Sequence, residues 1–252
     1  MTALIVGPGN VGRALGSFFH HHRVNYEFAT RTYTPASITP DRYHHVIITV
    51  KPQDRPAVCE MIRHHVDPAI PIISFMAGTP HSLLKQELQS RSVTRAMSGL
   101  HLERNAIITV YGDSATHPDL HRLFHPHRMF VTTNEFDIDD ATLYSGCLPA
   151  IIASIIKELS DHDPLRHQLI CDSIRGTLKL LQQQSESTLM TRVASEGGVT
   201  HQILRHLDPW YSHLHAAMAM GSARIASLPL SVAPPPPVHS PIYLRPGPED
   251  TR

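Results

Sequence analysis

The chain has 252 residues, and its 22 Lys and Arg residues balance its 22 Asp and Glu residues. Its length allows a sizeable core in one or two domains, and its formal charge of zero argues against a binder of nucleic acid or of an anionic membrane surface. The three cysteines, Cys59, Cys147 and Cys171, are odd in number and far apart, which fits neither a disulfide framework nor a zinc site and favours a cytoplasmic protein.

The first predicted element is an apolar strand, Ala3 to Val6, which leads into a glycine-rich turn. Because the chain enters this strand directly, we expect no signal peptide. A helical pattern of apolar residues follows, and this strand–turn–helix context indicates a dinucleotide-binding turn. Its first glycine allows a tight turn, the second lets a pyrophosphate approach, and the third lets the helix pack on the strand. A glycine-rich turn without a ligand is the alternative. The turn is Gly7-Pro8-Gly9-Asn10-Val11-Gly12.

The second strand, Tyr26 to Ala29, ends at the position where an acidic residue would bind the adenosine ribose. That position holds Thr30, Arg31 and Thr32 and no carboxylate. An arginine flanked by hydroxyls can pair with a 2′-phosphate, which a carboxylate would repel. The sequence therefore favours NADPH over NADH. A surface arginine that caps a loop is the alternative.

The pattern then alternates between strands and helices up to residue 134, which is typical of a doubly wound (Rossmann) sheet. Continuous apolar strands suggest burial on both faces, and their carboxyl ends should face the cofactor. Thr79 is a plausible cap of the helix that follows it. The further strands expected are Val46–Val50, Ile70–Phe75, Ser92–Met97, Ala106–Tyr111 and Phe130–Thr132, with helices over Pro56–His65 and Pro80–Leu88.

After Glu135 the pattern becomes helical, with helices expected over Asp139–Glu158, Leu165–Gln184 and Trp210–Ser227. The most apolar stretch, Leu148 to Ile156, is too short for a membrane span and indicates a core or interface helix. We therefore predict three segments: a dinucleotide-binding domain over 1–134, an all-helical dimerisation domain over 135–230, and a disordered proline-rich tail over 231–252.

Twenty histidines are spread along the chain, several of them in adjacent pairs or runs. Adjacent histidines point in different directions on a helix or strand, so these runs are poor chelates. We interpret them as solvated helix ends and loops, and we predict no metal site.

Several motifs together resemble those of the pyrroline-5-carboxylate reductase family, over residues 1–228. They are similar to the family's G-x-G-N-M-G-x-A, V-K-P-Q, A-G, S-G-S-G-P-A-Y and V-T-S-P-G-G-T-T. The matching segments are Gly7 to Ala14, Val50 to Gln53, Ala77-Gly78, Ser145 to Ala150 and Val193 to Thr200.

The resemblance implies an NADPH-dependent oxidoreductase that reduces a C=N bond, either 1-pyrroline-5-carboxylate to proline or a related cyclic imine. It implies a homodimer or a higher oligomer, formed through the helical domain, with the substrate site at the interface. The cofactor residues expected are Gly7, Gly9, Asn10, Val11, Gly12, Thr30, Arg31, Thr32, Val50, Lys51, Pro52, Ala77 and Gly78. The substrate residues expected are Ser145, Ser195, Gly197, Gly198 and Thr200, with Thr200 catalytic.

Elementary chemistry gives some of these residues a ligand-binding role, a purely structural role as the alternative, or both. Gly197-Gly198 before a helix that begins near Thr200 offers backbone N–H groups to a carboxylate. Thr200 could donate its hydroxyl to an imine nitrogen, or it could cap a Gln202–Leu207 helix. Ser145 could likewise cap the long helix, and Lys51 could be a solvated strand end.

The chain departs from the family pattern on the substrate side. Ser98-Gly99 replaces the Pro-Asn that follows Arg95-Ala96-Met97, Leu148 replaces a glycine, and Glu196 replaces a proline. An inward-pointing Glu196 would repel a carboxylate substrate and favour a cationic imine or amine. Two alternatives therefore stay open: an enzyme that acts on a different imine or oxo acid, and a non-catalytic dinucleotide-binding regulatory protein.

Overall fold

The computed structural model describes residues 1–32, 34–35, 38–89, 91–104, 107–124, 129–194, 196 and 198–228. These residues form two compact units. The first contains Met1–Gly146 together with the described stretch from Ser222, and the second contains Cys147–Gly221. The division into domains over 1–134 and 135–230 stays a prediction. The predicted tail over 231–252 lies outside the described residues.

The first unit is built on a seven-stranded sheet with the order β2-β1-β3-β4-β5-β6-β7. All neighbouring strands are parallel except β5 and β6. The chain crosses from one side of β1 to the other after β2, so a switch point lies at the carboxyl ends of β1 and β3. The strands are β1 Thr2–Val6, β2 Asn25–Ala29, β3 His45–Ile48, β4 Ile72–Ser74, β5 Val93–Met97, β6 Ile108–Gly112 and β7 Met129–Val131.

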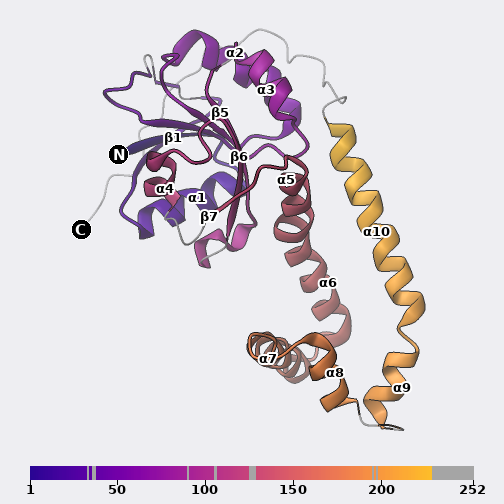
Figure 1. Ribbon diagram of the computed structural model, residues 1–252. Coiled ribbons are helices and arrows are strands. Elements are labelled where there is room, and N and C mark those ends of the chain that lie inside the picture. The colour runs from indigo at the N-terminus through magenta and orange to yellow at the C-terminus, as the bar shows by residue number, and fades with distance from the viewer. Residues whose placement is uncertain are drawn as a thin grey trace. The chain divides into compact units, whose positions relative to one another are not determined.

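Helices cover both faces of this sheet, with α1 and α4 on one face and α2 and α3 on the other (Figure 1). Alternate residues of each parallel strand therefore enter two separate cores, as for Ile47 on the α1 face and Ile48 on the α2 face. The doubly wound fold is confirmed. The helices of this part are α1 Asn10–His21, α2 Arg55–His65, α3 His81–Glu87, α4 Pro118–Phe124 and α5 Phe136–Ala141, with short 3-10 turns η1 Pro52–Asp54 and η2 Leu100–Arg104.

Three details of this unit differ from the sequence-based expectation. Helix α4 was not expected, because its short segment lies between two polar stretches. Strand β6 was expected, but its antiparallel direction has no local signal. Thr79 does not cap α3: the N-cap residue is Pro80, and the Thr79 hydroxyl donates to the Ala77 carbonyl oxygen at 3.4 Å.

The helix expected over 139–158 is longer than predicted. Helix α5 passes through a π-helical stretch, Thr142–Cys147, into α6, Leu148–Ser160. By length and composition, Phe136–Ser160 is apolar enough to cross a membrane, contrary to the expectation that no run would be. A single helix of this kind is weak evidence for a span, because the core helix of a soluble protein can meet the same criteria.

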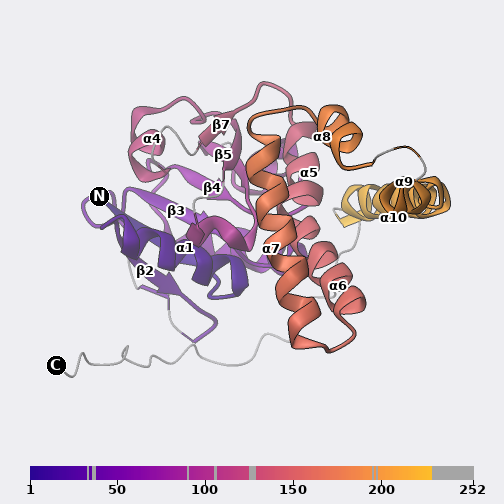
Figure 2. The ribbon, with the colours of Figure 1, turned by 90° about the horizontal axis from the view of Figure 1, so that it is seen from below.

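The described part of the second unit consists of helices (Figure 2). Helices α6 and α7 pack against each other, yet Ser160 is the sole buried residue of α6, and no residue of α7, α8 or α9 is buried in the described chain. Large apolar side chains are exposed instead, such as Leu165 at 66% and Leu169 at 58%. The helices after α6 are α7 Pro164–Leu181, α8 Glu186–Val193, α9 Val199–Arg205 and α10 Asp208–Ser227, the last of which ends in the first unit.

One histidine lies inside the core of the sheet and makes folding sensitive to acid. His45 on β3 is 3% exposed, and its Nδ1 atom has no hydrogen-bond partner among the described residues. Burial lowers its pKa to about 4, with the nearby His44 and His117 lowering it further and Asp119 opposing them. Because the unfolded chain takes up this proton below about pH 6.5, stability should fall by about 3 kcal/mol as the pH drops from 6.5 to 4.

Urea unfolding at several pH values tests this expectation. The slope of the unfolding free energy against pH reports how many protons are taken up on unfolding. His45→Leu should lower this number by up to one between pH 6.5 and 4. His64→Gln, which changes an exposed histidine of α2, is the matched control and should leave the slope unchanged. An unaltered slope in His45→Leu would contradict the assignment.

Candidate functional site

The glycine-rich turn joins the carboxyl end of β1 to α1, and its surroundings leave little space around two of its glycines. Gly7 has a φ of +104°, which side-chain-bearing residues rarely adopt. A Cβ atom there would lie 2.7 Å from Val50 Cγ1, and one at Gly12 would lie 2.1 Å from the Gly7 carbonyl oxygen. The fold itself therefore requires glycine at positions 7 and 12.

Gly9 is different, because nothing in the described protein lies within 4 Å of where its Cβ would be. It is the N-cap residue of α1, no side chain caps this helix end, and the first turn of α1 carries no acidic residue. The N–H groups of Asn10 and Val11 begin this first turn. Open space in front of uncapped helical N–H groups fits a pyrophosphate, so the turn fits a dinucleotide.

The predicted adenosine end contains an acidic residue that the sequence analysis missed. Arg31 is 88% exposed in its side chain, and its Nη2 atom lies 3.0 Å from Asp54 Oδ1, in η1. Thr30 and Thr32 lie together, with 3.1 Å between their hydroxyl oxygens. Asp54 closely follows the segment Val50 to Gln53, but its pairing with Arg31 depends on the tertiary fold. A carboxylate therefore lies beside the arginine proposed to bind a 2′-phosphate.

The ends of β3 and β4 carry the other predicted cofactor residues. Lys51 is exposed at the start of η1, Pro52 is the first residue of η1, and Val50 packs on one of the two cores. Gly78 has a φ of +59°, and a Cβ there would lie 2.3 Å from the Ile225 carbonyl oxygen. Packing against the end of α10 therefore explains this glycine. The cofactor roles of Ala77 and Gly78 stay a prediction.

A buried arginine fixes the start of the long helix in the first unit. Arg95 on β5 is 2% exposed in its side chain, and it pairs with Glu135 at 2.7 Å and with Asp139 at 2.9 Å. Glu135 also accepts a hydrogen bond from the His81 backbone N–H at 2.5 Å. This network ties α5 to β5 and to the N-terminus of α3.

Two of the segments that carry the resemblance meet in this part of the molecule. A Cβ at Gly99 would lie 1.9 Å from the Ser145 carbonyl oxygen. No side chain fits at position 99 unless the backbone moves, so the change from the family's asparagine is linked to the path of the π-helical stretch. Ser145 lies within that stretch, and the N-cap residue of α6 is Cys147. The interpretation of Ser145 as a helix cap is therefore wrong.

The remaining substrate residues lie in the second unit. Gly198 is the N-cap residue of α9 and accepts a hydrogen bond from the Gln202 N–H at 3.1 Å. Thr200 is the second residue of that helix and half-buried, so its interpretation as an N-cap is wrong. Glu196 is exposed. The predicted residues Ser195 and Gly197 lie outside the described part of the chain.

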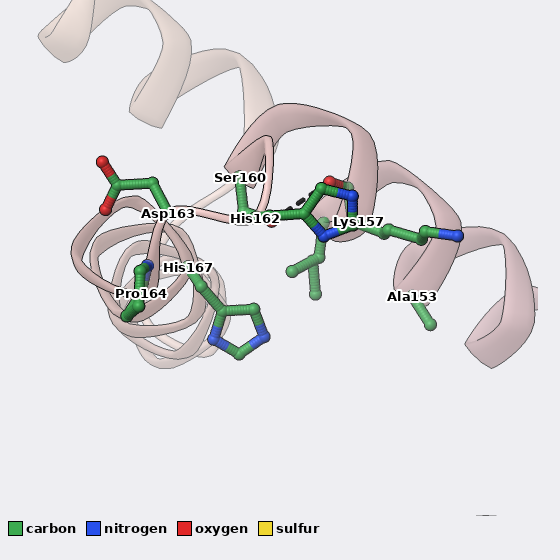
Figure 3. A pocket seen from close by; sticks show the side chains of 8 residues that line it. Ala153, Lys157, Ser160, His162, Asp163, Pro164 and His167 are labelled. Atoms are coloured by element: carbon green, nitrogen blue, oxygen red, sulfur yellow. Dashed lines mark hydrogen bonds between the residues drawn. The ribbon is translucent and has the colours of Figure 1, made fainter.

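A hollow of about 560 Å³ lies at the turn between α6 and α7 (Figure 3). Lys157, His162 and His167 line it, and none of the predicted site residues does. Asp163, also in its lining, accepts the Leu165 and Arg166 N–H groups and so caps α7. Over the described residues, no cluster of three or more His, Cys, Asp or Glu side chains is placed to hold a metal ion.

A doubly wound sheet with a glycine turn at its switch point, followed by helices, is typical of dinucleotide-binding proteins. The chain is 30% identical to the pyrroline-5-carboxylate reductase of Thermus thermophilus over 179 residues, which span 65% of this chain and 66% of that protein. It is 24% identical to the enzyme of that name from Staphylococcus aureus strain COL, over 79% of this chain and 76% of that protein.

The solved structure of Plasmodium falciparum pyrroline carboxylate reductase with NADP bound has the same fold. Its TM-score is 0.77 at 16% identity, with 91% of this chain and 98% of that chain covered. No profile of a known protein family matches the chain. The chain is a divergent member of the pyrroline-5-carboxylate reductase family.

Proposed function

We propose that this protein reduces a cyclic imine with NADPH, either 1-pyrroline-5-carboxylate to proline or a related imine. The observation that carries the proposal is the open space over Gly9 at the switch point of the sheet, in a chain that belongs to this family. In the reaction, a hydride adds to the imine carbon and a proton adds to the nitrogen, which gives a cyclic amine.

The residues of the chain would act by binding and orientation. The helical N–H groups at Asn10 and Val11 would hold the pyrophosphate, and Gly12 keeps α1 close to the strand. The bound dinucleotide would supply the hydride. The Thr200 hydroxyl, or a water molecule, would donate a hydrogen bond or proton to the imine nitrogen, because an iminium accepts a hydride more readily. Ser145, Ser195, Gly197 and Gly198 would position the substrate.

The substrate side supports a second candidate, a cyclic imine without a carboxylate. Glu196 is exposed two residues before the N-cap of α9, where it places a negative charge in the proposed carboxylate loop. The Ser145 backbone also fills the space beside Gly99. The charge at Glu196 favours a neutral or cationic imine over an anionic one. An oxo acid, and a regulator that binds dinucleotide without turnover, are the further candidates.

Steady-state oxidation of NADPH separates these candidates. The substrates are 1-pyrroline-5-carboxylate, 1-pyrroline as its analogue without the carboxylate, and a small 2-oxo acid. We expect turnover with at least one of the two imines. Preference for 1-pyrroline in the wild type, reversed in Glu196→Pro, would identify Glu196 as the cause. NADPH binding without turnover on any substrate would favour the regulator and contradict the proposed activity.

The helical unit supports the proposal of a homodimer or a higher oligomer. Leu159, Leu165 and Leu178 are each at least 60% exposed in the isolated chain, and helices without a buried face need a partner to be stable. The exposed apolar side chains would pack against those of a second copy. The apolar residues spaced along α6 from Leu148 to Leu159 would be part of that interface. The proposed partners are this second copy and the small-molecule imine, and the proposed location is the cytoplasm.

Arg31 gives a prediction about the choice of dinucleotide. Arg31→Ala should weaken NADPH binding about tenfold and leave NADH binding nearly unchanged, because the arginine would contact the 2′-phosphate that NADH lacks. Asp54→Asn should strengthen NADPH binding relative to NADH, because it removes the carboxylate 3.0 Å from Arg31. Isothermal titration of both dinucleotides measures the ratio. Tight NADH binding in a wild-type protein that does not distinguish the two dinucleotides would contradict the proposed preference.

A further inference from the structure

We infer that Thr49 is a positioning residue for the dinucleotide turn, whose hydroxyl holds the Gly7 carbonyl away from the bound phosphates. The inference rests on the proposed function, because it concerns the same cofactor site. Thr49 directly follows β3 and is 9% exposed. In the sequence it lies within the predicted strand Val46–Val50.

The hydroxyl of Thr49 lies between two carbonyl oxygens of the β1 end. Its Oγ1 atom is 2.6 Å from the Gly7 oxygen and 3.1 Å from the Val6 oxygen. A hydroxyl has a single hydrogen to donate, so the shorter contact identifies Gly7 as its main acceptor. The Val6 oxygen already accepts the backbone N–H of Thr49 at 2.9 Å. The side chain of Thr49 therefore forms a hydrogen bond to the turn, whereas its backbone N–H forms one to the end of β1.

The direction of the Gly7 carbonyl matters because of the positive φ at this residue. The Gly7 oxygen points toward Gly12, where an ideal Cβ would lie 2.1 Å from it. A carbonyl oxygen carries partial negative charge, and it would repel a pyrophosphate if the peptide rotated toward the open side at Gly9. The hydrogen bond from Thr49 opposes this rotation and keeps the acceptor inside the turn.

The same hydroxyl also limits the space around the first turn of α1. A Cβ at Gly12 would lie 2.8 Å from Thr49 Oγ1, so the hydroxyl, the Gly7 carbonyl and Gly12 are in close contact. A residue of similar shape without a hydroxyl would keep the packing but leave the Gly7 oxygen without this donor. Thr49→Val and Thr49→Ser therefore separate the packing of the Thr49 side chain from its hydrogen bond to the Gly7 oxygen.

Titration calorimetry with NADPH on the full chain tests the inference. Thr49→Val should weaken NADPH binding about tenfold, and Thr49→Ser should stay within about threefold of wild type, since serine keeps the donor. Thr94→Val is the matched control: Thr94 is buried in β5 and its hydroxyl oxygen accepts the Ser114 N–H at 3.2 Å. This control should lower the melting temperature without changing NADPH affinity.

Turnover gives a second readout that a purely structural role would not change in the same way. Thr49→Val should raise KM for NADPH and leave kcat at saturating NADPH unchanged, because Thr49 touches the turn and not the reacting atoms. NADPH binding to Thr49→Val as tight as to wild type would overturn the inference and leave the proposed function intact, as would failure of Thr49→Ser to restore binding. A wild-type protein that bound no dinucleotide would overturn both.

Discussion

Replacing Gly12 with alanine should strongly weaken dinucleotide binding while the sheet stays folded. The new Cβ would lie 2.1 Å from the Gly7 oxygen and 2.8 Å from Thr49 Oγ1, and the first of these is a backbone atom that the Thr49 hydroxyl holds in place. Such overpacking costs about 1–3 kcal/mol, so either α1 or the turn must shift. We expect an affinity loss of at least about 100-fold for NADPH, together with a lower melting temperature.

Gly9→Ala is the matched variant that separates an effect on ligand binding from an effect on the stability of the fold. Because nothing in the described protein lies within 4 Å of a Cβ there, this alanine should leave the melting temperature unchanged. If the open space accommodates a pyrophosphate, NADPH binding should still weaken about tenfold or more. Gly176→Ala, at another open glycine in α7, should leave binding at the wild-type level. Normal NADPH affinity in Gly9→Ala would show that this space does not belong to the ligand.

The fold could be predicted from the sequence to the extent that it depends on local patterns. The apolar strands, the helical spacing after Gly12 and the change to helices after Glu135 are all local signals, and the structure contains each of them. The antiparallel direction of β6 depends on its connection to β5, which in its described residues contains the short turn η2 and no crossover α-helix. No periodicity within Ile108–Gly112 encodes that choice.

The candidate site could be predicted only in part, because its supports join residues far apart in the sequence. The glycine turn is a local motif and was found. Its support by Thr49 spans 42 residues, and the pairing of Arg31 with Asp54 spans 23. Such contacts arise because the carboxyl ends of β1, β2 and β3 lie at the same edge of the sheet, so they can be identified only once the strand order is known.

The substrate-side departures also become easier to interpret with the structure. In the sequence alone, Gly99 is the loss of the family's asparagine. In the structure, the Ser145 backbone occupies the space where a side chain at position 99 would begin. A side chain at position 99 would therefore require the Ser145 backbone to move, so these two segments on the substrate side constrain each other.

The second large effect is expected at Arg95, which holds α5 on the sheet. Arg95→Met should destabilise the first unit by about 2–4 kcal/mol, because it leaves two partly buried carboxylates without their shared cation. Glu135 and Asp139 are four residues apart and face the same side of α5, where their charges would then repel each other. Urea unfolding of the full chain measures the loss. Arg122→Met, which breaks an exposed pair with Asp119, is the control and should change stability by less than about 0.5 kcal/mol.

A triple variant distinguishes charge from packing at this site. Adding Glu135→Gln and Asp139→Asn to Arg95→Met removes the unpaired charges and keeps the side-chain volumes, so it should recover at least half of the lost stability. If the triple variant is no more stable than Arg95→Met, the arginine acts mainly through its buried volume. The charged network would then not be what anchors α5. If stability is recovered, the electrostatic pairing on β5 fixes where the long helix begins, and with it the position of Ser145 against Gly99.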